Sequence, residues 1–414
     1  MLKDTYTSTG HKFFAHQEAM KNLRNGKGQP IVTHVMLTDV CNHSCAFCSV
    51  QARAGDSLPF DDVMAYLDTL IKYGLKAVIL SGGGNPILYK NGGRNFNDVV
   101  DAIHERGLEI GLITNGMPLR QYQVSGRHEG EMGEEHIETI RESWGTVSPK
   151  TLDKLTWIRI SMSGLDHDER EVYVPDLDPT KTTLGFSYVG HDIYNEPLDP
   201  HHGKVSTRKD LISVFDSGTK RHDGSVDFAE SHPNSAINYR APDRPFEGRI
   251  GDLTSAILHY SKVHHPRYVR LLPNCLEPEL IPQRCKQLQD MANFINFKLG
   301  EDVVFVQNKP PRAPKACYLG YIHPVLNADG FIYPCDSCVL NEAANHQFAN
   351  PWRMCHWSKI HEYYDTPVHS LITDPKETCP GCVFTGSNEL LIDVRHGRVD
   401  MTPTKETPEH VNFV

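Results

Sequence analysis

Short apolar runs alternate with helical patterns along most of the chain, and this alternation constrains the fold more than any other feature of the sequence. Short apolar runs are typical of strands buried in a parallel sheet, and apolar side chains at helical spacing predict the helices between them. The predicted strands are 31–40, 76–80, 108–114, 157–162, 183–189 and 267–272. The predicted helices are 14–23, 59–73, 96–106, 134–144, 149–155 and 253–262. The pattern predicts an α/β protein with helices on the outside of a parallel sheet.

Three cysteines follow the first predicted strand in C-x3-C-x2-C spacing: Cys41, Cys45 and Cys48. Thiols this close together at a strand end can turn onto one metal centre. A structural zinc site closes its shell with four ligands, whereas three cysteines leave one position open for an exogenous ligand. The alternative is three incidental or buried cysteines.

Glycine and asparagine residues follow the next two predicted strands. Gly82, Gly83 and Gly84 precede Asn85 and Pro86, and consecutive glycines let a backbone approach a ligand closely. Thr114, Asn115 and Gly116 end the third strand, where a plain β-turn explains Asn-Gly equally well. Both segments are expected at the carboxyl ends of their strands, where ligand groups gather in barrels of this kind.

Composition narrows the class of protein. The chain has 414 residues, enough for one large α/β domain and a smaller one. Eleven cysteines, without a stretch that reads as a signal peptide, favour metal ligation in a reducing, cytoplasmic compartment. No apolar run reaches the roughly 18–20 residues of a membrane span. The net charge of −10 does not favour nucleic acid as a partner.

The cysteine spacing, with Phe47 directly before the last cysteine, resembles the signature of the radical S-adenosylmethionine (SAM) superfamily. The resemblance implies a [4Fe-4S] cluster on Cys41, Cys45 and Cys48, with SAM bound at its open iron and cleaved to a 5′-deoxyadenosyl radical. It also implies that residues 31–312 form a partial (β/α)6 TIM-type barrel after an N-terminal extension, 1–30.

The same resemblance implies a set of SAM-binding residues along the strand ends. The Gly-Gly-Asn-Pro segment corresponds to the superfamily's Gly-Gly-Glu-Pro element, which holds the SAM amino group, so Asn85 stands where glutamate is usual. An amide oxygen can accept a hydrogen bond from an ammonium group but lacks the charge. The implied residues are Phe47, Gly83, Gly84, Asn85, Pro86, Thr114, Asn115 and Ser161.

A second set of cysteines lies in 313–414. Cys317 precedes two apolar runs around a glycine-containing turn, which predict a β-hairpin ending near Cys335, and Cys379 and Cys382 follow. This arrangement resembles the twitch domain, a shortened SPASM extension. The resemblance implies one auxiliary [4Fe-4S] cluster on Cys317, Cys335, Cys379 and Cys382.

Two alternatives remain for this second set. Cys335 and Cys338, with the later C-x2-C pair, form the two pairs of a zinc ribbon, although that reading leaves Cys317 unexplained. Cys338 or Cys355 could also replace one of the four cluster ligands.

These features predict a radical SAM enzyme that oxidises a small-molecule or peptide substrate by two electrons, with the auxiliary cluster as electron acceptor. An electron donor such as flavodoxin or ferredoxin is the expected partner. The long polar stretch 191–249 is interpreted as a substrate lid. The alternatives are a redox-neutral rearrangement, nucleotide modification with a structural auxiliary cluster or zinc site, or a non-catalytic metal-binding scaffold. No catalytic base is assigned.

Overall fold

The structure, a computed structural model, describes residues 5–7, 10–43, 45, 47–48, 55–119, 147–166, 171–192, 246–274, 277–307, 315–336, 352–371, 384–403 and 407–414. Ten of its strands are β1 Val32–Met36, β2 Ala77–Ser81, β5 Glu109–Thr114, β6 Trp157–Ser161, β7 Thr183–Gly190, β8 Tyr268–Pro273, β9 Val304–Val306, β10 Val325–Leu326, β11 Phe331–Tyr333 and β12 Cys355–His356. They form one sheet in the order β12-β11-β10-β1-β2-β5-β6-β7-β8-β9. A small separate hairpin pairs β3 Lys90–Asn91 with β4 Arg94–Asn95.

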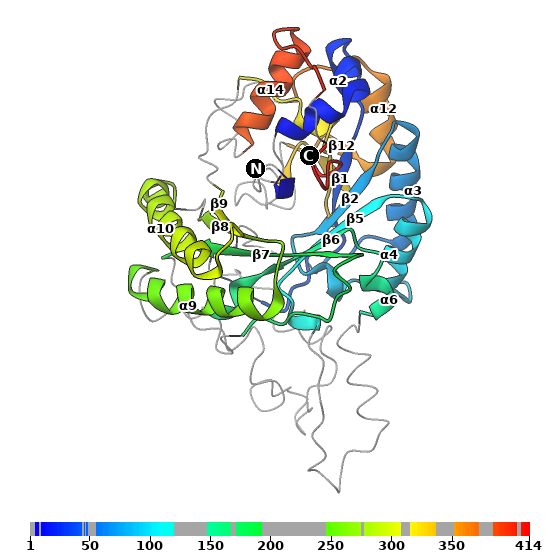
Figure 1. Ribbon diagram of the computed structural model, residues 1–414. Helices are drawn as coiled ribbons and strands as arrows, with labels where there is room; N and C mark the ends of the chain where they lie inside the picture. Colours follow the sequence, from blue (N-terminus) through cyan, green and yellow to red (C-terminus); the bar gives the residue numbers. More distant parts are fainter. Residues whose placement is uncertain are drawn as a thin grey trace, which may run out of the picture.

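The strands from β1 to β9 run parallel to their neighbours, and the sheet curves around the centre of the molecule (Figure 1). The prediction of an α/β fold with a large parallel sheet is confirmed, and all six predicted strands are present. The sequence analysis missed β9, because its three residues are too few to show a periodic pattern.

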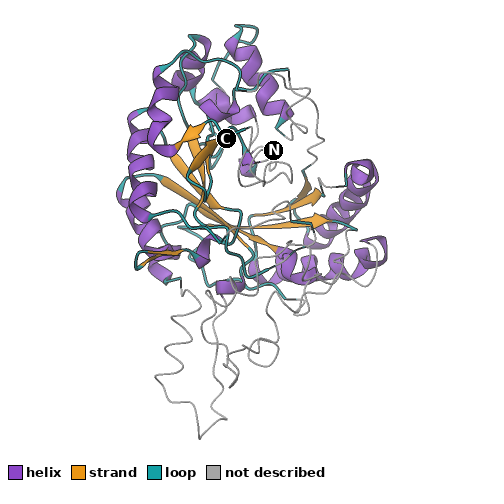
Figure 2. Ribbon diagram, turned by 180° about the vertical axis from the view of Figure 1, so that it is seen from behind, coloured by secondary structure: helices purple, strands orange, loops and turns teal. Residues whose placement is uncertain are grey.

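Helices cover the outer face of the curved sheet (Figures 1 and 2). The α-helices are α2 Gln17–Arg24, α3 Phe60–Lys72, α4 Phe96–Glu105, α6 Pro149–Leu152, α9 Phe246–His264, α10 Ile281–Leu299, α12 Ile360–Asp365 and α14 Thr385–Arg395. The 3-10 helices are η1 Gly10–Ala15, η2 Pro86–Leu88, η3 Met117–Leu119, η4 Met162–Asp166, η6 Pro278–Leu280, η7 Leu319–Tyr321 and η8 Trp357–Lys359.

Two helices differ from the sequence prediction. Helix α10 was missed, although its buried Leu288, Met291 and Ile295 recur at helical spacing. Helix α9 begins at Phe246, so the last residues of the 191–249 stretch belong to that helix. The predicted helix over 134–144 lies outside the described residues, as do residues 193–245, so the lid stays a prediction.

The predicted C-terminal hairpin is present as β10 and β11, with Gly330 at a φ of 78° in its turn. Strand β10 pairs in parallel with β1, with Val325 opposite His34. The hairpin therefore extends the barrel sheet at its β1 edge, and β12 adds a further antiparallel strand. The division of the chain into domains at 30 and 312 stays a prediction.

The described end segments of the chain, residues 5–7 and 407–414, lie inside the curve of the sheet (Figure 1). Phe413 packs edge-on against Trp157, the first residue of β6, with ring centroids 5.2 Å apart. Tyr6 stacks on Tyr268, the first residue of β8, at 4.7 Å. Buried Lys12 donates to the Phe413 carbonyl over 2.9 Å and so ties the two end segments together. These segments close the barrel at the amino ends of its strands.

Candidate active site at the carboxyl ends of the strands

The cysteine loop leaves the carboxyl end of β1. Cys41, Cys45 and Cys48 are partly exposed, and the Cys48 amide donates to the Cys45 carbonyl over 3.0 Å. Three thiols on one loop are suitable donors for an iron–sulfur cluster. Among the described residues, no three His, Cys, Asp or Glu side chains are already grouped to hold a metal. The ligand role of these cysteines stays a prediction.

Gly84 brings the loop after β2 against the cysteine loop. Its amide donates to the Thr38 carbonyl over 3.0 Å, and the next amide, of Asn85, donates to the Val40 carbonyl over 2.8 Å. A Cβ at position 84 would lie 2.0 Å from the Val40 oxygen, so only glycine permits this approach. Gly84 thus packs against the chain directly before Cys41.

Three asparagines from the ends of β1, β2 and β5 meet beneath this loop. The Asn85 Nδ2 donates to Asn42 Oδ1 over 3.1 Å and to Asn115 Oδ1 over 2.8 Å. The Asn115 Nδ2 also donates to Asn42 Oδ1, over 3.1 Å. Both Asn42 and Asn85 are buried, and we call the three side chains the amide triad.

The amide oxygen of Asn85 is also engaged. It accepts from the Thr114 hydroxyl over 3.0 Å and from the Ile87 amide over 3.3 Å, which caps η2. The Thr114 hydroxyl accepts in turn from the Gly116 amide over 3.1 Å. All the polar atoms of Asn85 therefore bind other parts of this edge, so in this structure the side chain joins three loops. A SAM contact by Asn85 stays a prediction.

The other predicted SAM-binding residues lie along the same edge. Pro86 is buried and begins η2, and Ser161 is the last residue of β6, opposite Ser187 of β7. Phe47 lies between Cys45 and Cys48, and Gly83 lies between β2 and Gly84. The fold gathers these residues at one end of the barrel, and their roles toward a cofactor remain untested.

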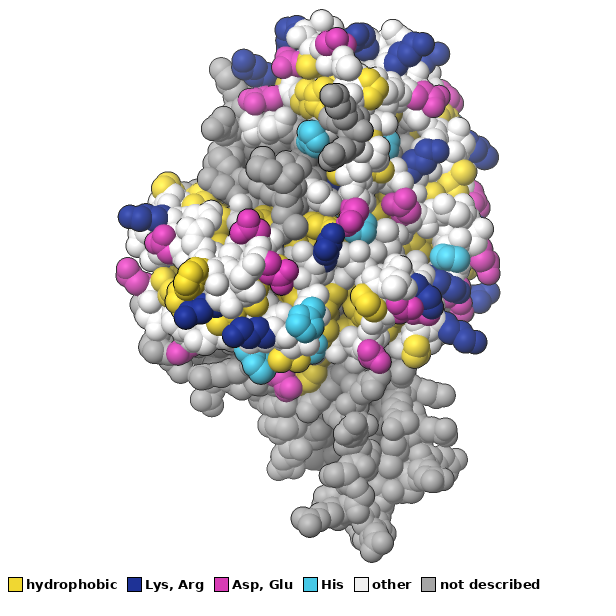
Figure 3. All heavy atoms as spheres, viewed as in Figure 1, with side chains coloured by type: hydrophobic (Ala, Val, Ile, Leu, Met, Phe, Trp, Pro, Cys, Tyr) yellow, Lys and Arg dark blue, Asp and Glu magenta, His cyan; other side chains and the backbone are white. Residues whose placement is uncertain are grey.

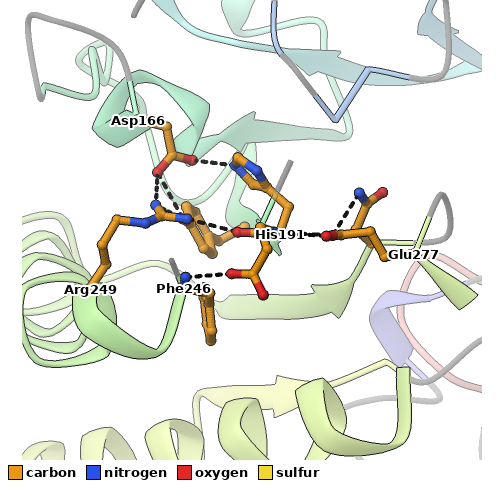
Figure 4. A network of polar contacts seen from close by, with 8 residues as sticks. Asp166, His191, Phe246, Arg249 and Glu277 are labelled. Atoms are coloured by element: carbon orange, nitrogen blue, oxygen red, sulfur yellow. Dashed lines mark hydrogen bonds and ion pairs between the residues drawn. The ribbon is translucent and has the colours of Figure 1, made fainter. Parts of the chain in front are cut away.

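A buried ionic network holds the carboxyl end of β7 (Figure 4). Asp166 Oδ1 accepts from Arg249 Nη1 over 2.6 Å and from the Tyr188 hydroxyl over 2.9 Å, and Asp166 Oδ2 lies 3.2 Å from His191 Nε2. Arg249 Nη2 donates to the His191 carbonyl over 2.8 Å. Burial, with the neighbouring Asp166 charge, raises the pKa of Tyr188 well above its usual range.

This ionic network touches the cysteine loop through one ring contact. The ring of His191 is fully buried, and its centroid lies 4.6 Å from that of Phe47. The ring atom Nδ1 of His191 has no hydrogen-bond partner. Asp166, His191 and Arg249 thus support the residue directly before Cys48.

Sequence analysis missed four residues of this edge: Asn42, Asp166, His191 and Arg249. Asn42 follows Cys41 directly, and its position beside the motif was a usable signal. The other three come from η4, the end of β7 and α9. Their contacts cross 25 to 83 residues of sequence, which no local pattern reveals.

Three residues of the second cysteine set lie in the described part of the chain. Cys317 is buried before η7, and Cys335 packs against Met36, Val325 and Tyr333 beyond the end of β11. Cys355 is opposite Ile332 in β12, whereas Tyr333, the next residue along β11, is opposite Val325. Because successive side chains of a strand alternate between faces, Cys355 lies on the sheet face opposite to Tyr333. Cys338, Cys379 and Cys382 lie outside the described residues.

On the face seen in Figure 3, basic and acidic side chains are interspersed over the described surface. No basic patch gathers there. No helix in the described part of the chain is both long and apolar enough to cross a membrane.

A comparison with protein families found a match for the first part of the barrel. Residues 35–171 match the model of the radical SAM superfamily. This range contains the C-x3-C-x2-C loop and all three asparagines of the amide triad. The resemblance to this superfamily that the cysteine spacing predicted is therefore confirmed for residues 35–171.

Curated relatives match about a third of the chain. The probable GTP 3′,8-cyclase of Saccharolobus solfataricus is 27% identical over 135 residues, 32% of this chain and 40% of that protein. An S-adenosylmethionine-dependent nucleotide dehydratase of Selenomonas ruminantium is 26% identical over 133 residues, 32% of this chain and 46% of that protein. A lipoyl synthase of Stenotrophomonas maltophilia is 24% identical over 135 residues, 31% of this chain and 40% of that protein. The matched region spans less than half the length of each relative.

Solved structures resemble the chain only distantly. SuiB of Streptococcus suis bound to its precursor peptide SuiA has a TM-score of 0.42 and 11% identity, over 85% of this chain and 68% of that chain. The native anSMEcpe structure with AdoMet and the Cp18Cys peptide has a TM-score of 0.44 and 13% identity, over 89% of this chain and 98% of that chain. Likenesses of this size carry no argument about function.

Proposed function

We propose that the protein is a radical SAM enzyme that abstracts hydrogen from a small-molecule or peptide substrate and oxidises it by two electrons. The observation that carries the proposal is the joining of three strand ends, through Asn42, Asn85 and Asn115, directly beside the C-x3-C-x2-C loop. In this proposal, Cys41, Cys45 and Cys48 hold a [4Fe-4S] cluster. When bound, this cluster and SAM supply a 5′-deoxyadenosyl radical for hydrogen abstraction.

The chain's own residues would fix the position of the cysteine loop. Gly84 and Asn85 hold the backbone before Cys41 through amides that donate to Thr38 and Val40. Phe47, before Cys48, rests on the His191 ring. Preorganised groups lower the cost of ordering a site at the moment of reaction. We infer that both ends of the cysteine loop are supported before any cofactor binds.

An auxiliary cluster on Cys317, Cys335, Cys379 and Cys382 is the proposed electron acceptor. A two-electron oxidation by hydrogen abstraction also releases one proton and one electron from the substrate, so an acceptor is required. The proposed ligand Cys335 packs against the hydrophobic cluster that contains Tyr333. Cys355 lies on the sheet face opposite to Tyr333, so it is a poor candidate ligand for the auxiliary cluster. Burial raises the pKa of the Cys355 thiol to about 12, which favours the protonated form.

The first test is chemical analysis of anaerobically reconstituted protein. We expect about eight irons per chain with matching sulfide and no zinc, the content of two four-iron clusters. A content of about four irons and one zinc would indicate a zinc ribbon in place of the auxiliary cluster. Protein that contains no iron after reconstitution would contradict the proposal as a whole.

The second test is turnover. After reduction with dithionite, the reconstituted protein should convert SAM to 5′-deoxyadenosine, and Cys48→Ala should abolish this product. The matched control is Cys285→Ala, since Cys285 lies on α10, away from the cysteine loop. Iron-loaded protein that forms no 5′-deoxyadenosine would favour a non-catalytic scaffold.

A nucleotide substrate is the second candidate. The names of two relatives that match about a third of the chain, a probable GTP 3′,8-cyclase and a nucleotide dehydratase, favour it. Two arginines in the barrel interior, described below, are suitable partners for phosphate. Comparing 5′-deoxyadenosine formation with and without GTP and other nucleoside triphosphates would test it.

A further inference from the structure

The barrel encloses a cavity of about 120 Å³ below the carboxyl-end edge. Its walls include two arginines, Arg159 of β6 and Arg270 of β8, and His34 of β1. Trp157 and Tyr268 lie at its amino end, where the end segments of the chain close the barrel. Inward-facing positions of such barrels are usually filled by branched apolar side chains, so two arginines there are unusual.

The strand register brings the two arginines into neighbouring layers. Arg159 is level with Gly185 of β7 and Tyr268 of β8, and Arg270 is level with Ser187 of β7. A Cβ at Gly185 would lie 2.1 Å from the Tyr268 ring. The missing side chain therefore leaves space for this ring to cross β7 toward Arg159.

Hydrogen-bonding capacity in the cavity exceeds what the chain uses. The Arg270 Nη1 donates to Gln307 Oε1 over 2.9 Å, but the Nε atoms of both arginines are buried without a partner. His34 Nε2 is also buried without a partner. Among the described residues, neither arginine forms an ion pair, although Asp336 also lines the cavity.

Two buried guanidinium groups cost stability unless an anion compensates them. Burial lowers the pKa of Arg159, and burial together with the nearby Arg159 lowers the pKa of Arg270 well below its usual range. Arg159 lies 5.7 Å from the Trp157 ring centroid, a contact that is too weak to offset the loss of its hydration. A hydrogen bond with Tyr268 and the charge of Asp336 favour the protonated form of Arg159, but they do not outweigh its burial. A buried cation with a donor that is still unused is a candidate for ligand binding.

We propose that Arg159 and Arg270 bind an oxyanion of the substrate, either a carboxylate or a phosphate. The inference rests on the proposed function, since it assigns the substrate class to that site. Guanidinium groups bind these anions through paired, charge-assisted hydrogen bonds. Arg159 lies two residues before the end of β6 and Arg270 three before the end of β8, which is about 7–10 Å along the strands. The anionic end is thus held inside the barrel while the rest of the substrate extends toward the cysteine loop.

The test is anion binding to the reconstituted full-length chain, measured by equilibrium dialysis with inorganic phosphate and with succinate. Thermal unfolding in each salt, against sodium chloride of equal ionic strength, is the second readout. At least one of the two anions should bind and raise the unfolding midpoint. Either Arg159→Met or Arg270→Met should weaken this binding about tenfold or more. Binding of phosphate but not succinate would indicate a phosphorylated substrate. Binding of succinate but not phosphate would indicate a carboxylate substrate.

A stability measurement separates ligand binding from a structural role. Without anion, Arg159→Met should unfold at the same temperature as the wild type or higher, because it removes a buried charge that forms no ion pair among the described residues and whose burial outweighs its favourable contacts. Arg159→Lys retains the charge without the paired donors, so it should bind more weakly while remaining folded. Arg398→Gln is the control: Arg398 is exposed on the surface beside Asp393, and this variant should bind like the wild type.

Three outcomes would overturn the proposal: binding of neither anion, equal weakening in Arg398→Gln, or unchanged binding in Arg159→Met with a lower unfolding temperature. The dialysis requires neither SAM nor turnover. Anion binding without formation of 5′-deoxyadenosine would therefore support the oxyanion site and contradict the proposed reaction.

Discussion

The carboxyl-end edge of the barrel and its interior are both polar, but they use their polar groups differently. At the edge, both amide atoms of Asn85 have two partners each, and Asn42 Oδ1 accepts from two amides. In the interior, Arg159, Arg270 and His34 each keep a buried nitrogen without a partner.

The difference separates two uses of buried polar side chains. A fully bonded network fixes the geometry of the loops that it joins, since breaking any bond leaves a buried group unsatisfied. A partly bonded set lowers stability and gains from a ligand that completes it. We therefore interpret the amide triad as the support of the cysteine loop and the interior as the region that receives a ligand.

The largest expected effect is at the edge. Gly84→Ala would place a Cβ 2.0 Å from the Val40 carbonyl oxygen, and the backbone on both sides would have to move. We expect a loss of about 3 kcal/mol of unfolding free energy or more, and lower iron content after reconstitution. Chemical denaturation and iron analysis would measure both.

The control for this change is Gly251→Ala on α9, where a Cβ would meet no atom within 4 Å. This variant should be slightly more stable, because alanine favours a helix by about 1 kcal/mol over glycine. Equal stability of the two variants would mean that the edge is not as tightly packed as described.

In the interior, His34 should make the protein sensitive to acid. Burial lowers the pKa of His34 to about 4, with Asp336, His323 and Arg159 as the charged or titratable neighbours. An unfolded histidine has a pKa near 6.5, so the unfolded chain binds the proton first as the pH falls. Stability should decrease from pH 6.5 to 4, by about 3 kcal/mol for this group.

Urea unfolding at several pH values would measure the slope of the unfolding free energy against pH. His34→Leu should flatten it, whereas His361→Gln, at an exposed position, should leave it unchanged. Equal slopes in the wild type and His34→Leu would show that the interior histidine is not the acid-sensitive group.

A smaller effect should follow from changing donors into acceptors in the amide triad. Asn85→Asp keeps the shape but loses both donated bonds, to Asn42 and Asn115. We expect a loss of about 2 kcal/mol at neutral pH. The carboxyl group would face amide oxygens, so its pKa in the folded state would be raised and the loss should shrink as the pH falls to 5.

Asn95→Asp is the matched control for that change. Asn95 Oδ1 caps α4 by accepting from the Asn97 and Asp98 amides, a role that aspartate fills equally well. Denaturation at pH 5 and pH 8 should separate the two variants, and an equal loss at both pH values would contradict the donor role of Asn85.

The smallest expected effect concerns the outer face of the sheet. Cys355→Ser should leave iron and sulfide unchanged and lower stability by about 1 kcal/mol, since a hydroxyl replaces a half-buried thiol. Cys335→Ser, on the neighbouring strand edge, should reduce the iron content by about half. Iron loss in Cys355→Ser would instead make Cys355 an auxiliary ligand.

Part of the site could be predicted because it depends on local order. The runs that became β1, β2 and β5 carry their own apolar pattern, and the cysteine, glycine and asparagine residues follow them directly. Parallel strands end at one edge of a sheet, so the meeting of these loops follows from the strand order alone.

What could not be predicted depends on register and on distant partners. The SAM contact predicted for Asn85 stays a prediction, but no local pattern shows that the Asn85 amide binds Asn42 and Asn115, which come from other loops. Arg159 faces a cavity only because β6, β7 and β8 align it with Gly185 and Tyr268.

By itself, the sequence determined the α/β class, the six predicted strands and the loop that carries Cys41, Cys45 and Cys48. These features depend on periodicity and spacing within short windows. Only the tertiary structure decided that β10 pairs with β1, that His191 supports Phe47, and that Arg159 and Arg270 share one cavity. Such contacts join residues far apart in the chain, and packing and register select them after the local elements have formed.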